Sequence, residues 1–185
     1  MLEQQLPSIG FIGAGTVGNA LAIRLSASGY PIVAVASRTL ASAEKLAARV
    51  PGCQVQTSTQ AVADAAEITF VTTPDGAIQQ VTDGIAWEPG KSVVHCSGSD
   101  SVAILESARR QGAGVGGFHP LQTFAGIERA VENIPGSTFA LEAGGDLLEK
   151  LKLMAEAVGG HWITLTAADK PAYHAAAVFA CNYLC

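Results

Sequence analysis

The chain has 185 residues, of which 49% are hydrophobic and 15% are charged, and its formal net charge is −5. This length suits one domain, or one domain with the start of a second, and it can bury a core without disulfide or metal staples. The composition excludes a disordered chain. The acidic balance argues against nucleic acid as a partner, because a nucleic-acid-binding surface needs a basic excess.

The cysteines and the two ends of the chain bear on metal binding and location. None of the four cysteines forms a Cys-x-x-Cys pair or a zinc-like cluster with histidine, so we expect no metal site. Residues 1–5 lack the basic segment and apolar run of a secretion signal. Residues 172–185 are too short to span a membrane and include His174 and Asn182. We therefore expect a cytoplasmic protein with no membrane partner.

Strand and helix patterns alternate along the first two thirds of the chain. Short apolar runs predict strands at residues 8–12, 32–36, 55–56, 68–72, 92–96 and 115–118. Helical periodicity with start and stop signals predicts helices at residues 16–28, 40–49, 59–65, 75–85 and 101–110, the last capped by Asp100. Each connection is long enough for a right-handed crossover. The pattern therefore predicts an α/β fold with a doubly wound, mainly parallel sheet.

The last third of the chain is less regular, and residues 119–135 show no clear pattern. Strands are predicted at residues 138–141 and 162–165, around an amphipathic helix at residues 146–158. Residues 168–185 begin a further helix, apolar on most sides and without a stop signal, which must be covered in the folded protein. A partner chain would cover it, but we favour a fragment of a longer protein. Residues 1–166 would then form one domain, and residues 167–185 the first helix of a helical C-terminal domain.

A glycine motif lies between the first predicted strand and the first predicted helix. Residues 13–18 read Gly-Ala-Gly-Thr-Val-Gly and match G-x-G-x-x-G in the context that a dinucleotide-binding turn requires. Gly13 permits the tight turn, Gly15 lets the pyrophosphate approach the backbone, and Gly18 lets the helix lie close to the strand. Thr16 and Val17 open the helix, whose free N–H groups attract phosphate. The motif predicts a Rossmann domain; the alternative is a glycine-rich turn without a ligand.

The residues after the second predicted strand bear on which dinucleotide is bound. NAD-binding domains usually place Asp or Glu there for the ribose 2′-hydroxyl, whereas this chain has Ser37, Arg38 and Thr39. A carboxylate would repel a 2′-phosphate, but Arg38 would attract it and the two hydroxyls can donate to it. We therefore predict NADP(H) rather than NAD(H). The alternative is that Arg38 is only a solvated loop residue.

The carboxyl ends of the next two predicted strands are expected to complete the cofactor site, because ligands of open α/β sheets lie there. The residues at these ends are Thr72, Thr73, Pro74, Ser97 and Gly98. We expect them beside the ribose and the nicotinamide. Asp75, which follows the first group, either belongs to this edge or only caps a helix.

Reduction of a carbonyl or imine needs a proton as well as a hydride, and histidine can donate one near neutral pH. His119 follows the sixth predicted strand, where it would either project into the cleft or only fix the next loop. The last helix offers three further polar side chains: Lys170, His174 and Asn182. His174 and Asn182 share one helical face, so they either satisfy a core or line a substrate cleft. We expect His174 or His119 to supply the proton and Asn182 to orient the substrate, and we slightly prefer His174.

Four segments carry a resemblance to a known family: residues 10–18, 95–98, 118–124, and 170–178 together with 182–184. They resemble a little-characterised family of two-domain bacterial oxidoreductases. Its Rossmann domain is similar to those of deazaflavin-dependent NADP reductases, pyrroline-5-carboxylate reductase and ketopantoate reductase. The resemblance implies an NADP(H)-dependent hydride transfer to a small carbonyl, imine or related acceptor. It also implies a homodimer formed through a helical C-terminal domain of unknown function.

The resemblance is incomplete at the last helix. In ketopantoate reductases a lysine on the comparable helix acts with asparagines one and two turns further on. His174 falls at the position of that lysine, Val178 at the first asparagine and Asn182 at the second. The difference argues against ketopantoate as the substrate. A non-catalytic NADP-binding sensor or scaffold remains the alternative function, and such a protein would tolerate loss of His119 and His174.

Overall fold

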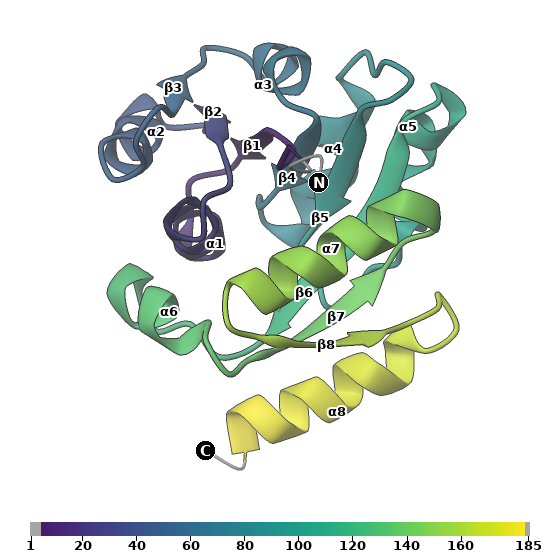
Figure 1. The fold of residues 1–185 in the computed structure, drawn as a ribbon. Coiled ribbons are helices and arrows are strands. Elements are labelled where there is room, and N and C mark those ends of the chain that lie inside the picture. The colour runs from purple at the N-terminus through teal and green to yellow at the C-terminus, as the bar shows by residue number, and fades with distance from the viewer. Residues whose placement is uncertain (1–4, 184–185) are drawn as a thin grey trace.

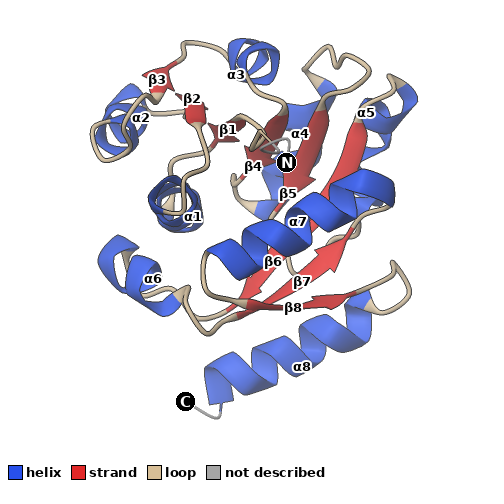
Figure 2. Ribbon diagram, viewed as in Figure 1, coloured by secondary structure: helices blue, strands red, loops and turns tan. Residues whose placement is uncertain are grey.

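In residues 5–183, which the computed structural model describes, eight strands form one sheet with helices on both faces (Figure 1 and Figure 2). The strands are β1 (Ile9–Ile12), β2 (Ile32–Ala36), β3 (Gln54–Val55), β4 (Ile68–Val71), β5 (Ser92–His95), β6 (Gly114–Leu121), β7 (Thr138–Glu142) and β8 (His161–Thr164). The helices are α1 (Thr16–Ala27), α2 (Leu40–Ala47), α3 (Thr59–Ala65), α4 (Asp75–Asp83), the 3₁₀ helix η1 (Val102–Leu105), α5 (Glu106–Arg110), α6 (Ile127–Asn133), α7 (Gly145–Ala157) and α8 (Lys170–Tyr183).

The strand order is β3-β2-β1-β4-β5-β6-β7-β8. The first six strands are parallel, which confirms the predicted doubly wound α/β fold. β7 then runs antiparallel to β6, with Phe118 opposite Leu141, and β8 is parallel to β7. The carboxyl ends of β1, β2, β4 and β5 therefore meet at one edge of the sheet, where a Rossmann fold binds its ligand.

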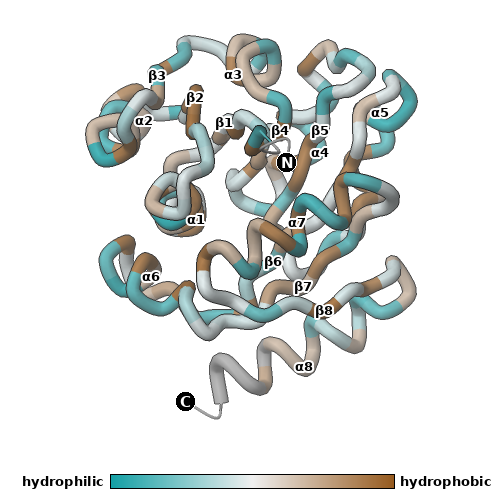
Figure 3. Tube along the Cα trace, viewed as in Figure 1, coloured by the Kyte–Doolittle hydropathy of each residue, from teal (hydrophilic) through white to brown (hydrophobic). Residues whose placement is uncertain are grey.

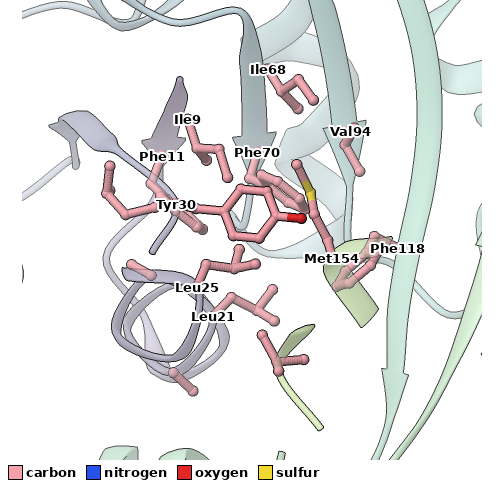
Figure 4. Packing of buried hydrophobic residues seen from close by; sticks show 14 of the residues in the cluster. Ile9, Phe11, Leu21, Leu25, Tyr30, Ile68, Phe70, Val94, Phe118 and Met154 are labelled. Carbon is pink, nitrogen blue, oxygen red and sulfur yellow. The ribbon is translucent and has the colours of Figure 1, made fainter. Parts of the chain in front are cut away.

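Two apolar cores lie on opposite faces of the sheet, and Figure 3 shows hydrophobic residues along the strands between them. One core packs α1, α6 and α7 against the sheet, and the other packs α3, α4 and α5. In the first core, Phe70 stacks on Phe11 with ring centroids 5.4 Å apart and meets the edge of Phe118 at 5.6 Å (Figure 4). Offset and edge contacts between aromatic rings are the stable arrangements, and these two tie β1, β4 and β6 together.

β6 is longer than predicted, and this moves His119. The strand continues to Leu121, so His119 lies inside it and does not follow it, which corrects the expectation from the sequence. Proline cannot donate to a strand ladder, and Pro120 follows His119 directly. However, β5 pairs with β6 only as far as Gly117, and beyond that point only β7 lies alongside. The missing N–H of Pro120 therefore faces no partner strand.

Two further local predictions need correction. η1 is capped by Ser101, whose hydroxyl accepts from the backbone N–H of Ala103 at 3.2 Å, and not by Asp100. α6 lies within the segment that showed no clear pattern. Its Ala130 is fully buried in the core that α6 shares with α1. The apolar positions Ile127, Ala130 and Ile134 have helical spacing, which was the signal for this helix.

α8 is the last described helix (Figure 1), and its first turn contacts the sheet through Lys170 and Tyr173. Its first residue, Lys170, is buried, whereas Phe179 is 63% exposed. Asn182 lies in α8, but its side chain is outside the described residues. Across residues 5–183, none of the helices combines the length and the apolar character needed to cross a bilayer.

Candidate functional site

The glycine turn joins β1 to α1 and is held by tight backbone contacts. Gly13 has a φ of 110°, a conformation that side chains disfavour, and its N–H donates to the Ala36 carbonyl at 2.8 Å. A Cβ on Gly13 would lie 2.8 Å from the Thr72 carbonyl. A Cβ on Gly18 would clash with the Gly13 carbonyl and lie 2.5 Å from Thr72 Oγ1. The fold itself therefore requires glycine at these two positions.

Gly15 differs from its two neighbours in the motif. It is exposed and caps α1 with φ −77° and ψ −170°, an extended backbone that any residue adopts. A Cβ built on it meets no atom within 4 Å. The fold does not require glycine here, but a pyrophosphate that approaches the helix N-terminus does. The turn therefore fits the dinucleotide that the motif predicts.

Two polar side chains brace the turn from inside. Asn19, which is 2% exposed, donates from Nδ2 to the carbonyls of Ala14 at 2.9 Å and Gly15 at 3.0 Å. Thr72 donates from Oγ1 to the Gly13 carbonyl at 2.7 Å. Thr72 was predicted as a cofactor contact; its hydroxyl binds the turn, and its contact with a cofactor stays a prediction. Asn19 was missed, although an asparagine on the buried face of a helix is a sign that it binds a nearby backbone.

The carboxyl end of β2 carries the residues predicted to choose between the two dinucleotides. Ser37 is half-buried, and Arg38 and Thr39 are exposed. Arg38 forms no ion pair with any described residue. Thr39 precedes α2, and its side chain makes no capping hydrogen bond. The guanidinium and the Thr39 hydroxyl are therefore open to a ligand at this strand end.

The ends of β4 and β5 are joined by a network around Ser97. Ser97 Oγ lies 2.9 Å from one carboxylate oxygen of Asp75 and 2.9 Å from one of Asp100, and its single hydrogen serves one of them at a time. Asp75 is the first residue of α4, and its cap position is taken by Pro74. Ser97 is 2% exposed, so its hydroxyl organises the loop. The contact of Ser97 with a nicotinamide stays a prediction.

At the same strand end, Thr73 is half-buried, and its Oγ1 has no hydrogen-bond partner within the described residues. Gly98 is buried beneath the His119 ring, since a Cβ there would lie 2.7 Å from His119 Nε2. His119 Nδ1 lies 2.7 Å from the Tyr173 hydroxyl on α8. The structure thus brings His119 against Gly98 and adds Tyr173, which sequence reasoning missed.

A buried ion pair lies behind this group. Lys170 Nζ is 3.8 Å from a carboxylate oxygen of Glu142 on β7 and donates to the Ser97 carbonyl at 3.4 Å. The side chains of Lys170 and Glu142 are 3% and 8% exposed. Burial lowers the pKa of Lys170, and the nearby carboxylates of Glu142, Asp100 and Asp75 oppose that shift. The pair ties the first turn of α8 to the ends of β5 and β7.

The two histidines near Lys170 are neutral at ordinary pH. Burial, and then the charge of Lys170, lowers the pKa of His95 and of His119 to about 4 in each case. His95 Nδ1 accepts from the Ser97 N–H at 3.1 Å, which places its hydrogen on Nε2. That Nε2 is buried without a partner among the described residues.

The other two predicted catalytic residues are His174 and Asn182, which both belong to α8. His174 is exposed on α8, next to Tyr173, and its charge contributes to the lowered pKa of His119. The side chain of Asn182 lies outside the described residues. Over the described part of the chain, no cluster of histidine, cysteine and acidic side chains could hold a metal ion.

Comparisons with known proteins agree with this architecture. The model of a Rossmann-like domain matches residues 1–120, and the model of a domain of unknown function, DUF2520, matches residues 137–185. The chain therefore belongs to the Rossmann-like domain family. No curated protein matches it.

Solved structures give the same fold. A Bacteroides fragilis protein assigned as an NADP oxidoreductase has a TM-score of 0.83 and 30% identity, with 97% of this chain and 68% of that chain covered. A Thermotoga maritima protein has a TM-score of 0.71 and 27% identity, with coverage of 95% and 64%. An arogenate dehydrogenase from Synechocystis has a TM-score of 0.72 and 25% identity, with coverage of 92% and 62%. The chain thus spans about two thirds of the length of these proteins.

Proposed function

We propose that this chain is the cofactor-binding part of an NADP(H)-dependent oxidoreductase. It transfers hydride between the nicotinamide and a small carbonyl, imine or related acceptor. The observation that carries the proposal is Gly15, a glycine that the fold does not need, at the N-terminus of α1 and beside open space. An NADP oxidoreductase and an arogenate dehydrogenase among the similar structures support the reaction class.

The choice of NADP(H) rests on the end of β2. Arg38 is exposed, has no ion-pair partner among the described residues, and lies between two hydroxyl side chains. A 2′-phosphate would accept charge-assisted hydrogen bonds from its guanidinium. A ribose 2′-hydroxyl would gain much less, because it carries no charge.

When it is bound, the dinucleotide supplies or accepts the hydride. The residues of this chain hold it and place the proton. Asn19 and Thr72 hold the glycine turn against the pyrophosphate. His119 lies against Gly98 beyond the end of β5, and with His174 it is a candidate for placing the proton, while Asn182 would orient the substrate. We also propose that residues 1–166 are the cofactor domain and that residues 167–185 begin a helical domain that forms a homodimer.

The test is a titration of the protein with NADPH and with NADH by calorimetry. The unaltered protein should bind NADPH more tightly. Arg38→Ala should weaken NADPH binding by about 1–3 kcal/mol, roughly 5- to 150-fold, the range of a hydrogen bond to a charged group. NADH binding should stay within about twofold, since a twofold change is only ~0.4 kcal/mol.

Arg110→Ala is the matched control, because it removes the same charge from an exposed arginine on α5 that pairs only with Glu106 among the described residues. It should leave both affinities unchanged. Equal affinities of the unaltered protein for the two cofactors would contradict the NADP(H) assignment. Binding of NADPH without its oxidation by carbonyl and imine acceptors would instead favour a sensor or scaffold.

A further inference from the structure

The loop that joins β5 to η1, residues 96–101, follows the carboxyl end of β5. It is folded around the Ser97 hydroxyl, whose oxygen accepts from the N–H groups of Ser99 at 3.3 Å and Asp100 at 3.1 Å. Ligands of open α/β sheets lie beyond strand ends of this kind. In the proposed function the β5–η1 loop therefore borders the nicotinamide half of the dinucleotide.

Two buried charges hold this loop from outside. Lys170 Nζ donates to the Ser97 carbonyl, near the start of the loop, at 3.4 Å. Glu142 Oε2 accepts from the N–H of Val102, the residue directly after the loop, at 3.3 Å. The same oxygen of Glu142 lies 3.8 Å from Lys170 Nζ. The ion pair thus connects the two ends of the loop, although neither of its residues belongs to it.

The two charges come from the last part of the chain. Glu142 ends β7, and Lys170 is the first residue of α8. Both lie in the segment that the DUF2520 model matches, whereas the β5–η1 loop lies in the segment that the Rossmann-like model matches. A buried charge is stable only while its partners are in place. The packing of the first turn of α8 and the shape of the loop therefore depend on the same contact.

We propose that Lys170 and Glu142 position the β5–η1 loop for the nicotinamide half of the dinucleotide, so that the packing of α8 and the binding of that half are coupled. The inference rests on the proposed function. Both residues act through the loop and are positioning residues. Coupling between two sites is reciprocal, so a bound nicotinamide should in turn stabilise α8.

The adenosine half of the dinucleotide has a separate support in the proposed site. It would bind to the glycine turn and to Arg38, at the ends of β1 and β2. The turn is braced by Asn19 and Thr72, and these hydrogen bonds involve neither Lys170 nor Glu142. Loss of the ion pair should therefore weaken binding of the nicotinamide half and spare the adenosine half. A loss of stability alone, in a protein that stays folded, would not separate the two halves.

The first experiment titrates the full-length protein by calorimetry with NADPH and with adenosine 2′,5′-bisphosphate, which carries the 2′-phosphate but lacks the nicotinamide. Lys170→Met should weaken NADPH binding by roughly 10-fold. This is the lower end of what a hydrogen bond to a charged group contributes, because the 3.4 Å contact is long. The affinity for the bisphosphate should stay within about twofold, a change of only ~0.4 kcal/mol.

A second variant separates positioning from stability. Lys170→Met combined with Glu142→Gln leaves no unpaired charge of this ion pair in the interior, so it should be more stable than Lys170→Met alone. It still lacks the ammonium group that binds the Ser97 carbonyl. The weakened NADPH binding should therefore persist in the double variant although stability is partly restored.

Lys91→Met is the matched control, because it makes the same substitution at the opposite end of β5. Lys91 directly precedes that strand, and its Nζ donates to the carbonyls of Asp64 and Ala66 at 2.9 Å each. This lysine also holds backbone in place, but away from the strand ends that bind ligands. Lys91→Met should lower stability and leave the affinities for NADPH and for the bisphosphate unchanged.

The second experiment tests the reciprocal effect in the unaltered protein by amide hydrogen exchange. Saturating NADPH should slow exchange in residues 173–177 of α8, whereas saturating adenosine 2′,5′-bisphosphate should not. Unchanged exchange in α8 with NADPH bound would overturn the coupling, and this result does not depend on whether any variant folds.

The remaining outcomes separate the inference from the proposed function. Full NADPH affinity in a folded Lys170→Met protein, or an equal loss for NADPH and the bisphosphate, would overturn the positioning role and leave the cofactor site intact. Recovery of NADPH affinity in the double variant would give the ion pair a purely structural role. If the unaltered protein binds neither ligand, the proposed function fails, and the inference that rests on it falls with it.

Discussion

Substitution at Gly15 separates binding from folding at the glycine turn. We expect Gly15→Ala and Gly15→Val to fold but to lose affinity for NADPH, with the larger loss in valine. The backbone at Gly15 is extended, with φ −77°, and an added Cβ meets nothing within 4 Å. The change in the free energy of unfolding should therefore be small, because the reduced freedom of the unfolded chain and the weaker helix cap are opposing effects of about 0.5–1 kcal/mol each.

The expected loss of binding is larger than this change in stability. A side chain at Gly15 occupies the space through which a pyrophosphate reaches the free N–H groups of α1. Loss of one or two hydrogen bonds to a charged group, at about 1.5–3 kcal/mol each, corresponds to a weakening of at least 10-fold and up to about 10⁴-fold. Alanine should fall at the lower end of this range and valine at the upper end.

Gly18→Ala is the matched control for this prediction. Its Cβ would clash with the Gly13 carbonyl and lie 2.5 Å from Thr72 Oγ1, so this variant should lose stability as well as binding. Urea denaturation measures stability, and calorimetric titration with NADPH measures affinity. Tight NADPH binding by a folded Gly15→Val protein would refute the proposed site, and unfolding of that variant would refute the structural argument.

Three further predictions concern the groups that brace the cleft. Asn19→Ala should lower the free energy of unfolding by about 1–3 kcal/mol and weaken NADPH binding, because two buried hydrogen bonds to the turn are lost; unchanged urea denaturation would contradict this. Lys170→Met should destabilise the protein by about 3–5 kcal/mol by leaving Glu142 buried without its cation, and Glu142→Gln in the same chain should restore part of the loss. The stability should also fall as the pH drops below 6.5, because the unfolded chain then protonates histidines that have a pKa of about 4 in the fold. The free energy of unfolding should change by at most about 1.4 kcal/mol per pH unit for each of His95 and His119. Urea denaturation between about pH 7.5 and 4.5 measures this slope, and His119→Asn should halve it.

The strands and the glycine turn were predictable because their signals are local. Outside β6, the predicted ends of the strands lie within one residue of those observed. In β6 the meaning of Pro120 depends on which strands lie beside it, and β5 ends before it is reached. The antiparallel direction of β7 likewise depends on the path that residues 122–137 take, and a turn signal such as Pro135-Gly136 does not fix which way the next strand runs.

The polar contacts of the cleft were much harder to predict. His119 and Tyr173 are 54 residues apart in the sequence, and Lys170 lies 73 residues after its acceptor Ser97. Neither pair has a spacing that a single sequence reveals. The helical face that holds His174 was visible from periodicity, but periodicity does not tell which turn of α8 meets the sheet. That depends on the buried pair of Lys170 and Glu142.

The glycines of the cleft show why geometry adds to a sequence motif. The motif treats Gly13, Gly15 and Gly18 alike, but the space for a Cβ is taken by the chain itself at the first and third and by nothing at the second. Gly98 lies outside the motif, and its Cβ space is filled by the His119 ring. A glycine whose Cβ space is filled by protein atoms is needed for folding. An exposed glycine beside open space, with a backbone that any residue adopts, instead indicates a ligand. On this criterion Gly15 is the residue of the turn that the proposed binding would require, and Gly98 is the residue whose missing side chain leaves room for the His119 ring.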